Sequence, residues 1–138
     1  MIKKLVKYED FNGNTCEEEL YFNMTKSELA KMQHSHGKKD YSLYLEEVMK
    51  SGDQGAMLEI TENFLLASYG IKSEDGSTFK KSAALREEFA SSAAYDELFM
   101  ELLQDANAME EFVIGVMPAN MKQEVYNKVN EINPQDNK

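Results

Sequence analysis

Several residue types that often reveal a function are scarce in this sequence. Cys16 is the only cysteine among 138 residues, so no disulfide can form within the chain, and a reducing compartment is the simplest setting. The seven glycines form neither a GxGxxG nor a GxxxxGK pattern, which excludes the common phosphate-binding loops. Tryptophan is absent, and the only histidines available as metal ligands are His34 and His36.

Positive charge is also in short supply. The chain has 25 Asp and Glu residues against 15 Lys and Arg residues, which gives a net charge of −10 at pH 7. Such a charge repels phosphate backbones and anionic lipid surfaces, so we expect neither nucleic acid nor a membrane as partner. No stretch approaches the roughly 20 apolar residues of a membrane span, and the first ten residues lack the apolar run of a signal peptide.

None of the reactive side chains stands in a catalytic pattern. His34 and His36 would point apart at a helix end, and the three glutamates that follow Cys16 would raise the pKa of its thiol. The paired carboxylates occupy adjacent positions, which face different directions on a helix. We therefore expect no enzyme, no catalytic residue, no metal site and no cofactor.

The N-terminal stretch LVKYEDFNGNTCEEELYFNM predicts an antiparallel β-hairpin within residues 1–24. Asn12-Gly13 is the preferred dipeptide for a type I′ turn, in which both central residues need positive φ. A two-residue turn would place Leu5 opposite Leu20, whereas a bulge would place Val6 opposite Leu20, and the sequence leaves both registers open. In either register a lysine-rich strand faces a glutamate-rich strand, which favours pairing.

Residues 25–132 are predicted to form a bundle of about six helices. Residues 54–69 are the most apolar segment and should form the central core helix, closed by Gly70, while Pro118 would begin the last helix. Side chains suited to capping precede the expected helices: Thr25, Asp40, Ser82, Ser92 and Asp105.

The sequence permits a second short hairpin around residues 71–80, because Asp75-Gly76 is another turn dipeptide. The predicted fold class is therefore α+β, mainly α, with an N-terminal antiparallel β-hairpin followed by helices. We expect one domain over residues 1–132 and a flexible tail over residues 133–138.

The segment AAYDELFMELLQDANAMEEFVIGVMP holds more apolar residues than one helix stripe buries. It fits either a buried helical hairpin or an exposed groove or oligomer interface that binds a protein. In the second case the protein-binding residues would be Tyr95, Leu98, Phe99, Leu102, Phe112, Val113, Ile114 and Met117. Of the nine methionines, the eight that fall in helix-like segments have two similar interpretations, core filling or an adaptable binding surface.

The hairpin also raises the question of association, because a lone hairpin is marginally stable and exposes two open edges. We expect one of its faces to pack on the helices and the hairpin to contribute to self-association. The chain would then be a homo-oligomer, with interface residues Val6, Tyr8, Leu20 and Phe22.

Four segments, in this order, resemble the tail assembly chaperones of long-tailed bacteriophages and prophages of Gram-positive hosts: YEDFNG, EEELYFNMTKSEL, SYGIKSEDGSTFKKS and YDELFMELLQDANAMEEFVIGVMP. The resemblance extends from about Ile2 to Ala119. It implies a protein that is not an enzyme, that binds the long tape measure protein and keeps it soluble, and that helps to recruit tail tube subunits. It also implies location in the host cytoplasm and absence from the mature virion.

Two further interpretations stay open beside this one. The same composition fits a structural tail completion or connector protein of the virion. It also fits an acidic inhibitor of a host protein, although lysines interspersed among the carboxylates interrupt any array that would mimic DNA.

Overall fold

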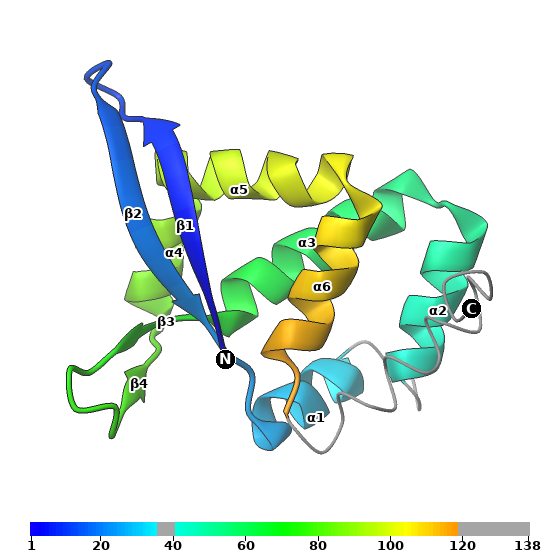
Figure 1. The fold of residues 1–138 in the computed structure, drawn as a ribbon. Coiled ribbons are helices and arrows are strands. Elements are labelled where there is room, and N and C mark those ends of the chain that lie inside the picture. Colours follow the sequence, from blue (N-terminus) through cyan, green and yellow to red (C-terminus); the bar gives the residue numbers. More distant parts are fainter. Residues whose placement is uncertain (36–40, 119–138) are drawn as a thin grey trace, which may run out of the picture.

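The computed structural model describes residues 1–35 and 41–118, which form two β-hairpins and six helices (Figure 1). The strands are β1 (Ile2–Glu9), β2 (Thr15–Phe22), β3 (Tyr69–Lys72) and β4 (Phe79–Lys80). The helices are α1 (Lys26–Ser35), α2 (Tyr41–Ser51), α3 (Gln54–Ser68), α4 (Ala83–Ala90), α5 (Ala93–Gln104) and α6 (Ala106–Val116). The predicted class, α+β and mainly α with an N-terminal hairpin, is confirmed, as is the second short hairpin.

Three predictions fall on residues outside the described part of the chain. These are the N-cap at Asp40, the helix that would begin at Pro118, and the tail over residues 133–138. The assignment of residues 1–132 to one domain stays a prediction.

The register of the first hairpin differs from both predicted registers. Lys4 lies opposite Leu20, and the strands end at the pair Glu9 and Thr15. The turn is therefore longer than the predicted two-residue type I′ turn. Gly13 has a positive φ of 84°, whereas no residue other than glycine has a positive φ among the described residues.

The side chain of Asp10 explains the longer turn. Its carboxylate accepts hydrogen bonds from the backbone amides of Asn12 (2.9 Å) and Asn14 (2.8 Å). The Gly13 amide donates to the Asp10 carbonyl (3.0 Å), as in a type I turn followed by a left-handed glycine. Asp10 thus shifts the register by stabilising a loop that the Asn-Gly dipeptide alone does not predict.

The predicted charge pairing across the hairpin is confirmed. The ammonium of Lys3 lies 3.7 Å from the carboxylate of Glu19, and that of Lys7 lies 3.7 Å from Glu17. Both pairs are exposed, so each contributes at most about 1 kcal/mol.

The two hairpins join into one four-stranded sheet in the order β1-β2-β3-β4. Tyr21 lies opposite Gly70, and Phe22 lies opposite Tyr69. Gly70 therefore belongs to β3 and does not close α3, which ends at Ser68 and continues directly into the strand. A Cβ at Gly70 would lie 2.6 Å from the Phe79 ring, so only glycine allows β4 to approach this closely.

The N-caps that can be checked agree with the sequence patterns. The Thr25 amide donates to the Glu28 carboxylate (2.8 Å) while the Glu28 amide donates to the Thr25 hydroxyl (3.2 Å), which is the predicted capping box. Ser82, Ser92 and Asp105 accept amide hydrogen bonds at the starts of α4, α5 and α6.

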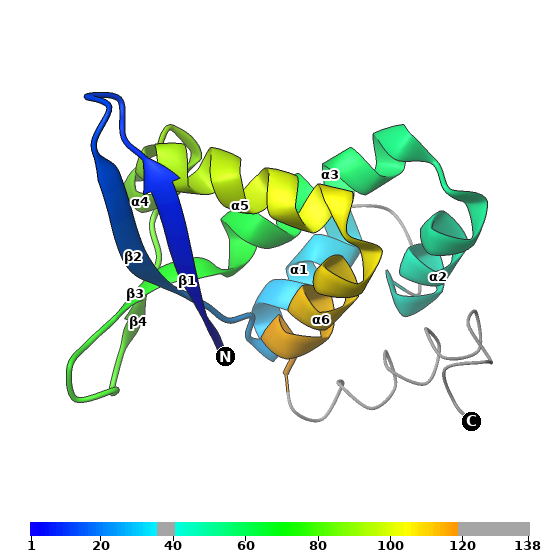
Figure 2. The same cartoon turned by 45° about the horizontal axis from the view of Figure 1, so that its top comes forward.

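The core forms where the inner face of the hairpin, α3, α5 and α6 meet (Figure 2). Helix α5 packs on β1 and on α3, and α6 packs on α5. Fully buried side chains come from all these elements: Phe22, Phe64, Leu65, Leu98, Leu102 and Val116. Within the described residues, no helix is long and apolar enough to cross a membrane.

Candidate functional site

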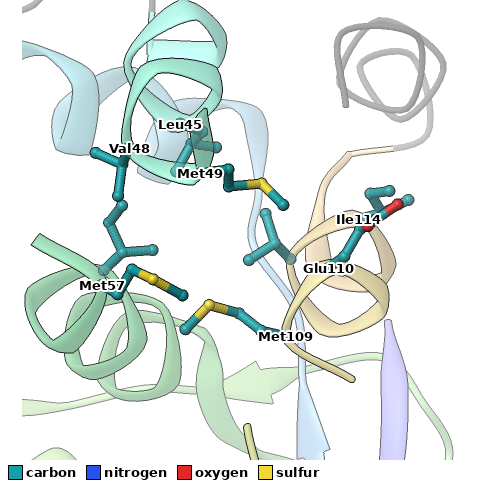
Figure 3. Close-up of a pocket in the computed structure, with 9 residues that line it drawn as sticks. Leu45, Val48, Met49, Met57, Met109, Glu110 and Ile114 are labelled. Atoms are coloured by element: carbon teal, nitrogen blue, oxygen red, sulfur yellow. The ribbon is translucent and has the colours of Figure 1, made fainter. Parts of the chain in front are cut away.

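A small apolar cavity lies between α2, α3 and α6 (Figure 3). Its volume is about 30 Å³, and an apolar void of that size stays dry because a water inside would find no hydrogen-bond partners. The residues that line it are Leu45, Val48, Met49, Met57, Ile60, Met109, Glu110, Val113 and Ile114.

Helical spacing brings these side chains together from three separate segments. Helix α2 contributes three residues at i, i+3 and i+4, beginning with Leu45. Helix α3 contributes Met57 and Ile60, three positions apart, and α6 contributes Met109 and Val113, four positions apart. Such residues lie on one face of a helix, so each helix turns one apolar stripe toward the cavity.

Three methionines give this cavity a deformable wall. The side chains of Met49, Met57 and Met109 point toward the same space from three helices (Figure 3). Methionine has a flexible, polarisable side chain that repacks easily around irregular shapes. Helix α2 has its main packing contact with α3. A small displacement of α2 would therefore widen the cavity while the hairpin, α5 and α6 stay packed together.

The charge near this cavity lies outside its apolar interior. Glu110 is the only charged residue in the lining, and its carboxylate points away from the methionines (Figure 3). Nearby on α2, burial raises the pKa of Tyr44, and the carboxylates of Glu59 and Asp53 add to that shift. The site therefore suits an apolar side chain that inserts from a partner.

The structure separates the eight residues predicted to bind a protein. Five are buried, with at most 8% of their surface exposed: Leu98, Leu102, Phe112, Val113 and Met117. Tyr95, Phe99 and Ile114 are partly exposed. For these five residues, the interpretation as a buried helical hairpin applies. On α5, for example, β1 and α3 cover the inner stripe of the helix. Val113 and Ile114 line the cavity, and binding by any of the eight stays a prediction.

The predicted self-association residues lie on the inner face of the hairpin. Val6, Leu20 and Phe22 are buried against the helices, so they are unavailable as an exposed interface in this fold. Tyr8 is partly buried, and its hydroxyl donates to the Glu18 carboxylate at 2.9 Å. That hydrogen bond is the largest cause that raises the pKa of Tyr8 to about 12. Self-association itself stays a prediction.

Six apolar residues of the cavity wall were not among the eight residues predicted to bind a protein. They are Leu45, Val48, Met49, Met57, Ile60 and Met109. The usable signal was the abundance of methionine. The pattern did not show which methionines would meet.

The other reactive side chains form no second site in the part of the chain that the structure describes. Partial burial and the Asp10 carboxylate raise the pKa of the Cys16 thiol, whose sulfur lies 3.5 Å from Asp10 Oδ2. The direction agrees with the sequence prediction, although Asp10 contributes more than the neighbouring glutamates. Among residues 1–35 and 41–118, no group of three or more His, Cys, Asp or Glu side chains is placed to hold a metal ion.

Residues 1–138, the whole chain, match the sequence model of a family described as phage tail assembly chaperone. The chain belongs to this family. A search of curated proteins and a search of solved structures found no match.

The resemblance seen in the sequence segments is therefore confirmed. For a phage tail assembly chaperone, the relevant property of a site is how it accommodates another protein. The methionine-lined cavity combines an apolar interior with a repackable wall.

Proposed function

We propose that this phage tail assembly chaperone binds the tape measure protein, keeps it soluble and helps to recruit tail tube subunits. Membership of the whole chain in the family is the observation that carries this proposal. The proposal includes action in the host cytoplasm and absence of the chaperone from the mature virion.

The methionine-lined cavity is the proposed docking site for the client. A tape measure segment would insert an apolar side chain between α2 and α6, and the methionines would repack around it. This arrangement would cover apolar client surface that otherwise aggregates.

Co-expression tests the function. The tape measure protein of the same phage should be mostly insoluble alone and should become soluble, and co-purify, with this chaperone. A client that stays insoluble in its presence would contradict the proposal. Mass spectrometry of purified virions distinguishes a chaperone from a structural tail component, because a chaperone should be missing from the virions.

A matched pair of variants tests the docking site. Met57→Gln places a polar amide of similar size in the cavity wall, whereas Leu58→Gln makes the same kind of change at the adjacent residue, which is 42% exposed. We expect Met57→Gln to weaken client binding at least about fivefold, since the minority of contact residues that cost more than about 1 kcal/mol when altered cluster in well-packed, desolvated pockets. Isothermal titration with a tape measure fragment measures this loss. Equal affinities for both variants would remove the cavity from the binding site.

A further inference from the structure

The first strand, β1, forms an open edge of the sheet. In the strand order β1-β2-β3-β4 it pairs with β2 alone (Figure 1). An edge strand presents backbone N–H and C=O groups that no neighbouring strand uses. Strand β1 has 8 residues, whereas β4 at the opposite edge has 2. Of the two edges, β1 is therefore the one long enough to take a further strand.

The hairpin register shows which backbone groups of β1 face outward. Hydrogen-bonded and non-hydrogen-bonded pairs alternate along an antiparallel ladder. The Asp10 amide donates to the Asn14 carbonyl (2.9 Å), so the even-numbered residues of β1 bond to β2. The odd-numbered residues direct their backbone groups away from β2, and within residues 1–35 and 41–118 these groups have no other hydrogen-bond partner. They are Lys3, Leu5, Lys7 and Glu9.

A groove of about 270 Å³ lies along this edge, between β1 and α5, and opens to solvent. The residues that line it are Leu5, Val6, Lys7, Glu97, Leu98 and Glu101. None of them lines the methionine cavity, so the two are separate sites. A strand added to β1 would lie in this groove with one face toward α5 and the other toward solvent.

Lysines border the groove on the solvent face of β1. Lys3 and Lys7 are exposed, and they pair with Glu19 and Glu17 on the side of β2. Their other side, toward the open edge, remains accessible to a second carboxylate. Leu5 lies between them and is 55% exposed. The solvent face therefore suits a strand that carries carboxylates on both sides of an apolar residue.

Carboxylates border the groove on the side of α5. Glu97 is exposed and forms no ion pair with a described residue. Glu101 lies 3.5 Å from the ammonium of Lys4, and both residues remain partly accessible to solvent. The inner face of an added strand would therefore favour lysine or arginine beside Glu97.

The same charges disfavour a second copy of β1 as the added strand. In the antiparallel register centred on Leu5, Lys3 of each strand would lie opposite Lys7 of the other. Like charges directly opposite each other destabilise a strand pair. The edge therefore suits a chain of different sequence.

We propose that the open edge of β1 binds an extended segment of another protein, which joins the four-stranded sheet as a fifth strand. This segment carries carboxylates around an apolar residue on its outer face and a basic residue on its inner face. Backbone hydrogen bonds supply the affinity of such a contact, and alternate side chains supply the specificity. The contact goes beyond the proposed client docking, because it uses no residue of the methionine cavity.

A synthetic peptide, TEKVTET, tests the proposal on the full wild-type chain. Paired antiparallel to β1, it places valine opposite Leu5, glutamates opposite Lys3 and Lys7, and lysine opposite Val6. Titration of the nitrogen-15-labelled chain, followed by NMR, should shift the amides of Lys3, Leu5 and Lys7 most and slow their hydrogen exchange. The charge-swapped peptide TKEVTKT should bind at least tenfold more weakly.

N-methylation of the peptide separates strand addition from simple charge attraction. A methyl on the amide of the central valine removes a hydrogen bond to β1, so binding should fall at least tenfold. A methyl on the amide of the neighbouring lysine, which faces away from β1, should change binding less than about threefold. Both peptides keep the same side chains and the same charge.

A matched pair of chain variants tests the same edge. Leu5→Pro removes the central outward N–H without removing a hydrogen bond to β2, and proline is tolerated at such edge positions. It should lose peptide binding at least tenfold, whereas Leu5→Thr keeps the N–H and should stay within about threefold of the wild type. Circular dichroism checks that both variants fold. If Leu5→Pro does not fold, the N-methylated peptides decide the question on the wild-type chain.

Three results would overturn the proposal: shifts confined to residues outside β1 and α5, equal binding of the two N-methylated peptides, or equal binding of the charge-swapped peptide. An oligomer mass that falls in Leu5→Pro would assign the edge to a second copy and would overturn it as well. None of these measurements uses the tape measure protein, so their outcome is independent of the co-expression test.

Discussion

Lys81 joins three separate segments of the chain through one ammonium group. Its Nζ donates to the carbonyls of Asn23 (2.6 Å) and Ala67 (2.8 Å) and to both carboxylate oxygens of Glu28 (2.7 Å each). Burial lowers the pKa of Lys81, and Glu28 partly opposes that shift. For Glu28 burial alone would raise the pKa, but hydrogen bonds from Lys81 and Thr25 outweigh it and the net shift is downward. The residue fixes β4 to α1 and α3.

Replacement of Lys81 by methionine should lower the free energy of unfolding by about 2–3 kcal/mol, because two carbonyls and a partly buried carboxylate lose their partner. Urea denaturation followed by circular dichroism measures the loss. Lys80→Met, the same change at an exposed neighbour, should stay within about 0.5 kcal/mol of the wild type. Equal midpoints for the two variants would show that the Lys81 network contributes little.

At the scale of elements, the contact between β3 and β4 depends on the absence of a side chain at Gly70. A Cβ at Gly70 would lie 2.6 Å from the Phe79 ring and 2.9 Å from the Lys80 carbonyl oxygen, so the backbone itself would have to move. At Gly55 in α3, a Cβ would meet nothing closer than 3.5 Å. Gly70 therefore leaves no room for a side chain, whereas Gly55 does.

Gly70→Ala should destabilise the chain by about 1–3 kcal/mol through this overpacking. Gly55→Ala should be neutral or stabilise it by about 0.4–1 kcal/mol, because alanine reduces the entropy of the unfolded chain and favours the helix. Thermal unfolding of both variants checks the signs. A stabilising Gly70→Ala would contradict the close approach of the two strands.

Local patterns in the sequence predicted the starts of helices well, because there a side chain bonds to the backbone of residues only a few positions away. The capping box of Thr25 with Glu28 and the caps at Ser82, Ser92 and Asp105 are examples. Prediction failed at the first turn because the Asn12-Gly13 dipeptide was weighed without the carboxylate of Asp10, although its contacts with Asn12 and Asn14 are also local. It failed at Gly70 because the close approach of Phe79 depends on strand packing that no local pattern shows.

At the scale of the whole molecule, the sequence predicted the family but not the set of residues that line the cavity. The apolar excess of AAYDELFMELLQDANAMEEFVIGVMP left burial and protein binding open, and the fold buries Leu98, Leu102, Phe112 and Val116 of this segment. The cavity that remains is made by α2, α3 and α6 together, and its residues are spread from Leu45 to Ile114. Only the three-dimensional packing shows which methionines meet.

The methionine methyl groups offer the most direct test of the proposed client site. A chain labelled with carbon-13 at these methyls can be titrated with a tape measure fragment and followed by NMR. The account predicts the largest shifts at Met49, Met57 and Met109, with Met24, buried in the core, and Met100, on the outer face of α5, nearly unchanged. Large shifts at Met100 with unmoved cavity methyls would contradict it.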